Sequence, residues 1–474
     1  MSPTTQAPTI FWFRRDLRLS DNPALVEAAT LSAQGVLGLF IIDPSLLATS
    51  GSTRAGFLLS TLRSLSASMN EQLVVRTGDP VEVLSALAAS TGARVVVATG
   101  DYAPAGMARD QRVRGALAAL GVELRLVDSP YVVVPGTVHT KAGTSSRVFT
   151  PFFRHWLTEP QPPPVPVPEG LRWLSAESSD LAEILPLAAT KRPSYFGDLP
   201  DGPAPLEIPA GEVAAHSLVA GFASRVAAYD DARNLPGVTG TSRLSPHLRF
   251  GSIHPRQVLA TLSGVTKGHE VFTSEIAWRE FYADVLFHNP DSTHVNIQRS
   301  LDGLRVDRDA AAVARFQTWA RGETGFPLVD AGMRQLLEEG WMHNRVRMVT
   351  ASFLVKHLHL DWRWGAHWFM WRLVDGDVAS NQQGWQWTAG TGTDASPYYR
   401  VFNPTLQAER FDPGGDYVRR YVSELASVPA PACLLPGGGS SSESLFAYAR
   451  PMIDLSNERR EALDRLAELR GPGG

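Results

Sequence analysis

The sequence predicts an α/β N-terminal domain, built on a doubly wound, Rossmann-like parallel sheet, followed by an all-α C-terminal domain. Two observations carry this prediction. Between residues 9 and 130, short apolar runs alternate with amphipathic segments, as in a parallel sheet covered by helices. From about residue 206 onward, strand patterns disappear and helical periodicity dominates. We therefore divide the chain into an α/β domain at 1–130, a connection at 131–205 and a helical domain at 206–474.

The N-terminal elements follow from their apolar periodicity. We expect strands at 9–13, 36–42, 73–76, 93–98 and 122–127, and helices at 24–33, 53–69, 80–90 and 109–120. No GxGxxG follows the first strand, so the dinucleotide-binding fingerprint is absent. The charged loop RRDLRLSDN stands there instead, at the sheet edge where open α/β sheets bind ligands. For Asp21, Asn22 and Pro23 we favour an ordinary helix cap.

The connection and the C-terminal domain differ in composition. The connection is irregular and contains the Pro-rich run PQPPPVPVPEG, which has no helix-forming capacity. Helical patterns then cover 212–233, 254–262, 274–287, 311–322, 328–341, 345–358 and 364–374. We expect a mobile loop at 436–444 and a surface helix at 444–470.

Composition limits the class of protein. Charged residues make up 19% and apolar residues 44%, which is a globular balance. Cys433 is the only cysteine, which rules out an intramolecular disulfide and fits a reducing cytoplasm. No apolar run approaches the length of a membrane span, and the N-terminus lacks a signal-peptide pattern. We expect a cytoplasmic monomer with no membrane association and no metal.

The stretch from Trp341 to Asn403 mixes aromatic rings with polar side chains. It contains Trp341, Trp362, Trp364, Trp368, Trp371, Trp385 and Trp387. A helical core with Trp at helical spacing is one interpretation. Cations outnumber acids from residue 341 to residue 372. The only acid in this segment is Asp361, whereas the cations are Arg345, Arg347, Lys356, Arg363 and Arg372. The net charge of −4 argues against a uniformly basic surface, but it permits a local basic groove for a flat, charged ligand such as a nucleotide or a flavin.

Three motifs resemble those of the photolyase/cryptochrome family. They are WMHNRVRM at 341–348, DGDVASNQQGWQWTAGTGTDASPYYRVFNP at 375–404 and TSRLSPHLRFGSIHPRQ at 241–257. The first resembles the class I branch, which repairs cyclobutane pyrimidine dimers in DNA. The likeness begins at FWFRRDLRLSDNPAL and so covers most of the chain. It implies a lyase whose excited, reduced FAD gives an electron to the dimer, and it makes the helical domain the FAD-binding domain.

The resemblance also assigns cofactor residues. It places FAD against Tyr229, Thr241, Ser242, Arg243, Leu244, Ser245, Phe272, Arg347, Asp375, Gly376, Asp377 and Asn381. Arg347 would pair with Asp375, and the Asn381 amide would face flavin N5, where many cryptochromes carry another residue. Two plainer interpretations stay open. Ser245 and Pro246 also suit a helix cap, and the DGD segment also suits a solvated turn.

A second set of residues would bind DNA and act in catalysis. The resemblance implies a dimer pocket of Glu275, Trp278, Asn344, Met348 and Trp387, and DNA contacts from Arg233, Arg279, Arg345, Arg400 and Gln407. A protonated Glu275 would stabilise charge on the dimer. Asn381, Met348 and the electron carriers Trp385 and Trp362 complete the expected catalytic set. An ordinary amphipathic helix also explains Glu275 and Trp278.

The chain departs from the family pattern at two places. The family carries a third Trp for flavin photoreduction, but no Trp occurs here between Trp278 and Trp319, and Trp364 and Trp319 are the aromatic candidates. Ala105 and Gly106 stand where some relatives hold a folate antenna with an Asn-Glu pair. We therefore expect 8-hydroxy-5-deazaflavin as antenna, ahead of an empty site, a flavin and, last, methenyl-tetrahydrofolate.

Two rival functions stay open at this stage. A cryptochrome-like photoreceptor would keep the flavin but lack the dimer pocket. A flavin-binding structural or single-strand-binding protein would restore no DNA under light.

Overall fold

The computed structural model describes residues 7–140, 143–201, 209–439 and 448–469. Its contacts divide the chain into two compact units. Unit 1 consists of residues 1–191, 208–227 and 242–290. Unit 2 consists of residues 192–207, 228–241 and 291–474. The boundaries predicted at 130 and 205 stay a prediction.

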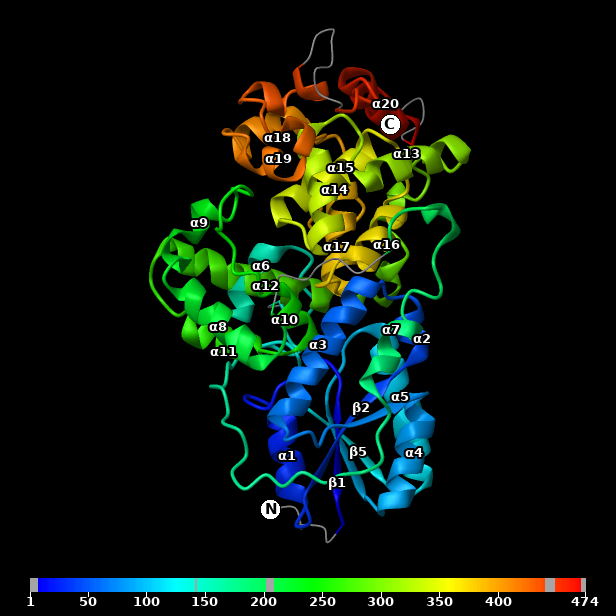
Figure 1. Cartoon of the computed structure of the whole chain (residues 1–474), viewed down its shortest axis with the longest axis vertical. Helices are drawn as coiled ribbons and strands as arrows, with labels where there is room; N and C mark the ends of the chain where they lie inside the picture. The colour runs from blue at the N-terminus through cyan, green and yellow to red at the C-terminus, as the bar shows by residue number, and fades with distance from the viewer. Residues whose placement is uncertain (1–6, 141–142, 202–208, 440–447, 470–474) are drawn as a thin grey trace. The chain divides into compact units, whose positions relative to one another are not determined.

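Unit 1 contains the predicted parallel sheet (Figure 1). Its strands are β1 (Thr9–Phe13), β2 (Val36–Ile42), β3 (Val74–Thr77), β4 (Val95–Thr99) and β5 (Glu123–Val127). They pair in the order β3-β2-β1-β4-β5, and every neighbouring pair is parallel. The order reverses direction at β1, so the doubly wound α/β prediction is confirmed.

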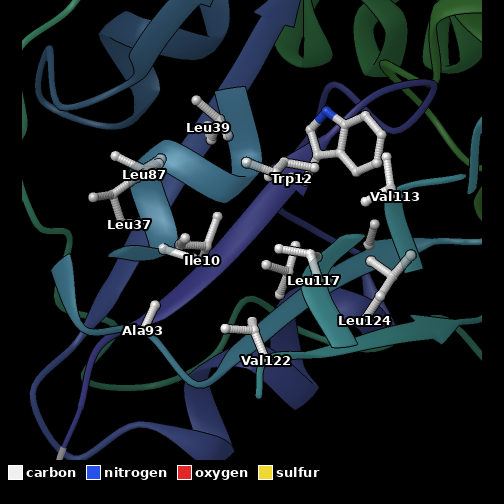
Figure 2. Packing of buried hydrophobic residues seen from close by; sticks show 14 of the residues in the cluster. Ile10, Trp12, Leu37, Leu39, Leu87, Ala93, Val113, Leu117, Val122 and Leu124 are labelled. Carbon is white, nitrogen blue, oxygen red and sulfur yellow. The ribbon is translucent and has the colours of Figure 1, made fainter. Parts of the chain in front are cut away.

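Alternate residues of the strands supply one apolar core (Figure 2). Ile10 and Trp12 of β1 point to the same face as Leu37 and Leu39 of β2. The helices α4 (Pro80–Thr91) and α5 (Pro104–Ala119) cover this face with Leu84, Leu87, Val113 and Leu117. All of these side chains are nearly inaccessible to solvent, so the sheet is held mainly by apolar burial.

Among the remaining helices of unit 1, α1 (Pro23–Leu31) begins at a side-chain cap that the sequence offers. Asn22 accepts the amide of Leu25 at 3.1 Å and starts this helix, which confirms the cap interpretation of that segment. The others are α2 (Pro44–Ala48), α3 (Ser52–Ser68), α6 (Phe149–Trp156), α7 (Ile184–Leu187), α8 (Glu212–Ala223), α10 (Ser245–Phe250), α11 (Pro255–Thr261) and α12 (Lys267–His288).

The described part of unit 2 is helical, as predicted (Figure 1). Its α-helices are α9 (Tyr229–Ala232), α13 (Ala310–Arg321), α14 (Pro327–Glu339), α15 (Asn344–Lys356), α16 (Trp362–Arg372), α17 (Val378–Ala389), α18 (Pro404–Phe411), α19 (Asp416–Tyr421) and α20 (Leu455–Glu468). The side chains of Phe316, Trp319 and Trp368 are fully buried in its core. Among the described helices, none is both long enough and apolar enough to cross a membrane.

Two predicted helices have different bounds in the structure. The pattern at 212–233 is not one helix, because α8 ends at Ala223 and a 3-10 turn at Val226–Ala228 precedes α9. Gly221 and Ser224 lie at this break, and both are weak helix formers. The terminal helix begins only at Leu455, after Pro451, because proline lacks the amide that a helix interior needs. Most of the expected mobile loop lies outside the described residues.

Candidate functional site in each unit

In unit 2, an ion pair joins α15 to the segment between α16 and α17. The ring of His343 accepts the amide of Arg345 at 3.2 Å and so begins α15. This start places Arg347 one turn into the helix. Its guanidinium donates two hydrogen bonds to the Asp375 carboxylate, at 3.2 and 2.8 Å. The Asp375 side chain is only 3% exposed, so the carboxylate of this bidentate pair is shielded from water, whereas the Arg347 side chain is 23% exposed.

The DGD segment is a helix start. The carboxylate of Asp377 accepts the amide of Ser380 at 3.1 Å and caps α17. Asn381 and Gln383 therefore lie on a helix, and the alternative of a solvated turn at the DGD segment does not hold, because Asp375 and Asp377 are both buried. An Asp followed three residues later by a free amide satisfies a helix N-terminus as well as it satisfies a turn.

The orientation of the Asn381 amide is fixed by its neighbours. Its nitrogen donates to the Ala366 carbonyl at 3.1 Å and to the Gln382 side-chain oxygen at 2.8 Å. Gln382 presents that oxygen because its own amide nitrogen donates to the Thr293 carbonyl. Both amide hydrogens of Asn381 are thus engaged within the protein. The oxygen is the end of Asn381 that can meet a ligand.

Three expected ligand-binding residues share one face of α12 in unit 1. Glu275, Trp278 and Arg279 follow each other at helical spacing and are half-buried. Trp278 stacks on Phe149 with centroids 3.8 Å apart and an interplanar angle of 9°. The guanidinium of Arg279 donates to the carbonyls of Pro130 and Leu248 at 3.2 and 3.1 Å. Arg279 thus also holds local backbone.

Sequence reasoning missed the next residue on that helix. Glu280 is buried and accepts the amides of Val132 and Val133 and the indole N–H of Trp156, at 2.6, 3.0 and 2.7 Å. Burial raises the pKa of Glu280 even though these three donors oppose the shift. A Glu within an apolar helical pattern was the available signal, because such a residue is rarely buried without partners.

The segment before α10 does not have the expected residue at the N-cap position. Leu244 occupies the N-cap position, and Ser245 is the first helical residue, so the prediction that Ser245 caps the helix is wrong. Arg243 has a φ of 54°, a left-handed conformation that a non-glycine residue seldom adopts. Ser242, Arg243, Leu244 and Ser245 belong to unit 1, as does the buried Phe272 of α12. Thr241 belongs to unit 2.

The other expected DNA contacts of unit 2 differ in exposure. Arg400 and Asn344 are exposed, whereas Met348, Trp387 and Gln407 are half-buried. Arg345 donates to the Asn234 side chain at 2.6 Å and lies 4.5 Å from the centroid of the Phe411 ring. Arg233 lies 5.6 Å from the centroid of the Tyr229 ring.

The prediction of a basic groove at 341–372 is wrong, because most of the cations counted there are paired or buried. Arg347 is neutralised by Asp375, and Arg363 binds Asp361 at 3.0 Å. Lys356 and Arg372 are buried, and they donate to the carbonyls of Arg400 and Leu337. Helical spacing turns these cations in different directions, which a count along the sequence cannot show.

In unit 1, the sheet edge beside α5 carries a network of opposite charges. The guanidinium groups of Arg14 and Arg109 lie 4.7 and 5.0 Å from the centroid of the Trp12 ring. Burial favours the neutral acid, but the cations of Arg15, Arg109 and Arg14 hold the pKa of Asp101 below its ordinary value. A Cβ at Gly106 would approach the Asp101 carboxylate to 2.2 Å. The missing side chain of Gly106 therefore makes room for Asp101.

Comparison with known proteins places these elements in a family. A model of the DNA photolyase family matches residues 9–169, and a model of the FAD-binding domain of DNA photolyase matches residues 272–468. A deoxyribodipyrimidine photo-lyase from Halobacterium salinarum is 39% identical over 98% of this chain and 99% of its own length. The chain belongs to the DNA photolyase family.

Solved structures agree with this membership. A class III photolyase from Agrobacterium tumefaciens superposes with a TM-score of 0.88 and 37% identity, covering 99% of both chains. A Synechocystis cryptochrome superposes with a TM-score of 0.84 and 25% identity, covering 98% of this chain and 100% of that chain. The fold thus occurs in both branches, and the expected class I assignment stays a prediction.

Proposed function

We propose that this member of the family is a deoxyribodipyrimidine photo-lyase, which uses blue light to split cyclobutane pyrimidine dimers in DNA. Reduced FAD, once excited, supplies an electron to the dimer and recovers it when the ring has opened. The near full-length likeness to photo-lyases supports this reaction. A photoreceptor without repair is the second candidate, favoured only by the likeness to a cryptochrome.

The orientation of Asn381 is the observation that carries the proposal. Reduced flavin has an N–H at N5, which needs an acceptor, whereas oxidised flavin has none. Asn381 presents its oxygen because its nitrogen is held by Ala366 and Gln382. The acceptor oxygen that Asn381 presents therefore fits the reduced cofactor. The shielded Arg347–Asp375 pair would keep the neighbouring segment in place.

The roles of the other cofactor-binding and DNA-binding residues are also proposals, and they rest on the resemblance to the family. We assign FAD contacts to Tyr229, Thr241, Ser242, Arg243, Leu244, Ser245, Phe272, Gly376 and Asp377. On α12, Glu275 and Trp278 would contact the dimer, with Glu275 donating a proton in a hydrogen bond to the base edge. On α15 and α17, Asn344, Met348 and Trp387 would contact it, and Arg233, Arg279, Arg345, Arg400 and Gln407 would contact the DNA strand.

A repair assay with the purified, chemically reduced protein tests the function. Dimer-containing DNA should be restored under blue light and remain unchanged in the dark. Asn381→Asp should depress repair while FAD stays bound, because a carboxylate cannot donate to Ala366 and Gln382 and meets two oxygens instead. Gln383→Glu makes the same amide-to-acid change two residues away and should retain repair. Absence of repair in the parent would favour the photoreceptor, and normal repair by Asn381→Asp would contradict the role of Asn381.

We also propose 8-hydroxy-5-deazaflavin as a second chromophore, ahead of an empty site, a flavin and methenyl-tetrahydrofolate. Ala105 and Gly106 offer a pterin neither an amide nor a carboxylate, and each unpaired donor would cost about 1–3 kcal/mol. Asp101 fills the space at Gly106, so the support comes from the missing donors and not from open space. Chromophores extracted from protein made in its native host should include the deazaflavin, whereas a bound folate would contradict this choice.

A cytoplasmic, monomeric state completes the proposal. The only cysteine, Cys433, is buried, which suits a protein that needs no disulfide.

A further inference from the structure

The path for photoreduction expected through Trp362 has an unfavourable environment in this chain. The segment that would carry a third Trp contains none, because no Trp lies between Trp278 and Trp319. Trp362 donates its indole N–H to the Asn296 side chain at 2.9 Å. The guanidinium of Arg363 lies 4.8 Å from the centroid of its ring. A cation over the ring opposes removal of an electron from it, because the oxidised ring would also be positive, and the pairing of Arg363 with Asp361 reduces this effect.

A different series of rings leads away from Trp385. Its ring lies 6.3 Å from that of Trp319 on α13, at an interplanar angle of 73°. Phe369 lies against both rings, with centroids at 5.0 Å from Trp385 and 6.2 Å from Trp319. Trp319 is fully buried, and its indole N–H donates to the Thr350 carbonyl at 3.1 Å. Trp385 is thus in edge contact with the buried indole of Trp319.

The series continues from Trp319 to the surface of unit 2. Phe316 lies one turn earlier on α13, 5.8 Å from Trp319 and 5.8 Å from Trp364. Trp364 of α16 stacks on Tyr195, with centroids 4.9 Å apart and an interplanar angle of 18°. Phe316 cannot itself be oxidised readily, but its ring fills the gap between the two indoles. Tyr195 is half-buried at the end of this series.

The last ring has a proton acceptor beside it. The hydroxyl of Tyr195 lies 2.8 Å from Nδ1 of His367, which is exposed to solvent and stands one turn after Trp364 on α16. Although part of the His367 side chain is exposed, desolvation of the rest lowers its pKa, with Asp361 opposing and Arg363 adding to the shift, so the ring is neutral at neutral pH and can accept a proton. Burial also raises the pKa of Tyr195, which therefore keeps its proton until it is oxidised.

We propose that Tyr195 is the terminal electron donor for photoreduction, through Trp364, Trp319 and Trp385. When oxidised FAD is bound and excited by light, Trp385 would supply it with one electron. Trp319 then gives an electron to the oxidised Trp385, Trp364 gives one to Trp319, and Tyr195 gives one to Trp364. The electron finally lost is that of Tyr195, and its phenolic proton moves to Nδ1 of His367. The tyrosyl radical left behind is neutral, and the positive charge passes with the proton to His367, whose exposed side chain can release it to water. This inference rests on the proposed function, since it concerns how the cofactor becomes reduced.

Transient absorption and electron paramagnetic resonance on the FAD-loaded, oxidised protein test the proposal. The parent should show a tryptophan radical that gives way to a tyrosyl radical, and this step should slow in D₂O. Tyr195→Phe keeps the ring stacked on Trp364 and should abolish the tyrosyl signal. His367→Gln can still hydrogen-bond the phenol but cannot take its proton, so it should slow the step. Tyr399→Phe, at an exposed tyrosine, should behave as the parent does.

A second pair of variants distinguishes the electron path through Trp319 from the path through Trp362. Trp319→Phe should abolish the tyrosyl signal, whereas Trp362→Phe should leave it intact. The opposite result, or a tyrosyl signal that survives Tyr195→Phe, would overturn the proposal. Repair by chemically reduced protein should be normal in Tyr195→Phe, His367→Gln and Tyr399→Phe. A parent that forms the tyrosyl radical but repairs no DNA would reject the proposed function and leave the path standing.

Discussion

At the scale of single residues, Lys356 has an unusual environment for a lysine. It is the last residue of α15, only 1% exposed, and donates to the Arg400 carbonyl at 3.0 Å. Its ammonium lies 5.4 Å from the centroid of the Tyr398 ring. Burial, followed by the repulsion of Arg400, lowers the pKa of Lys356 to about 8. The sequence placed Lys356 in a basic groove, and only its packing reveals the desolvation.

This shift predicts how stability depends on pH. Below pH 8 the lysine is charged in both states, so the folded protein bears the full cost of burying it. Between about pH 8 and 10.5 the unfolded chain binds more protons, so the free energy of unfolding rises with pH, by about 3 kcal/mol across the window. Urea unfolding at several pH values measures this rise. Lys356→Met should remove it, and equal slopes in variant and parent would contradict the assignment.

The sequence nominated residues for the candidate site, but it could not give their orientation. The motif DGDVASNQQGW pointed to Asn381, but its rotation depends on Gln382 and on carbonyls from distant segments. In the same way, the sequence could not show that Arg279 is engaged with the carbonyls of Pro130 and Leu248. Such contacts are decided by packing between elements, and no local pattern encodes them.

At the scale of elements, periodicity predicted regular structure best where it repeats. The five strands and the sheet type follow from short apolar runs separated by helices, and β1, β2 and α4 begin within a residue of the expected positions. The connection at residues 131–205 shows the opposite case, because it has no regular pattern. Tyr195 lies in a segment without periodicity, so nothing local indicated its stacking on Trp364 or its contact with His367. A functional role there becomes visible only when α16 is in place.

At the scale of the whole molecule, an acidic chain is proposed to bind a polyanion. The net charge is −4, and the cations counted at 341–372 are mostly paired or buried. Affinity for DNA must therefore come from few local contacts. Among the proposed ones, Arg400 is exposed and Arg345 is held in a fixed position by Asn234 and Phe411. Each phosphate that a protein cation contacts releases a condensed counterion, which makes binding depend on salt.

Salt dependence of binding to dimer-containing DNA tests these contacts one by one. Arg345→Ala and Arg400→Ala should each weaken binding and flatten the slope of log affinity against log salt by about one unit. Arg305→Ala is the matched control, because this exposed arginine pairs with Glu461 and Glu468 of α20 and its loss changes the net charge equally. Its slope should equal that of the parent. If all three variants flatten the slope alike, binding responds to net charge and neither arginine contacts a phosphate. If Arg345→Ala and Arg400→Ala leave the slope unchanged, the strand contacts other residues.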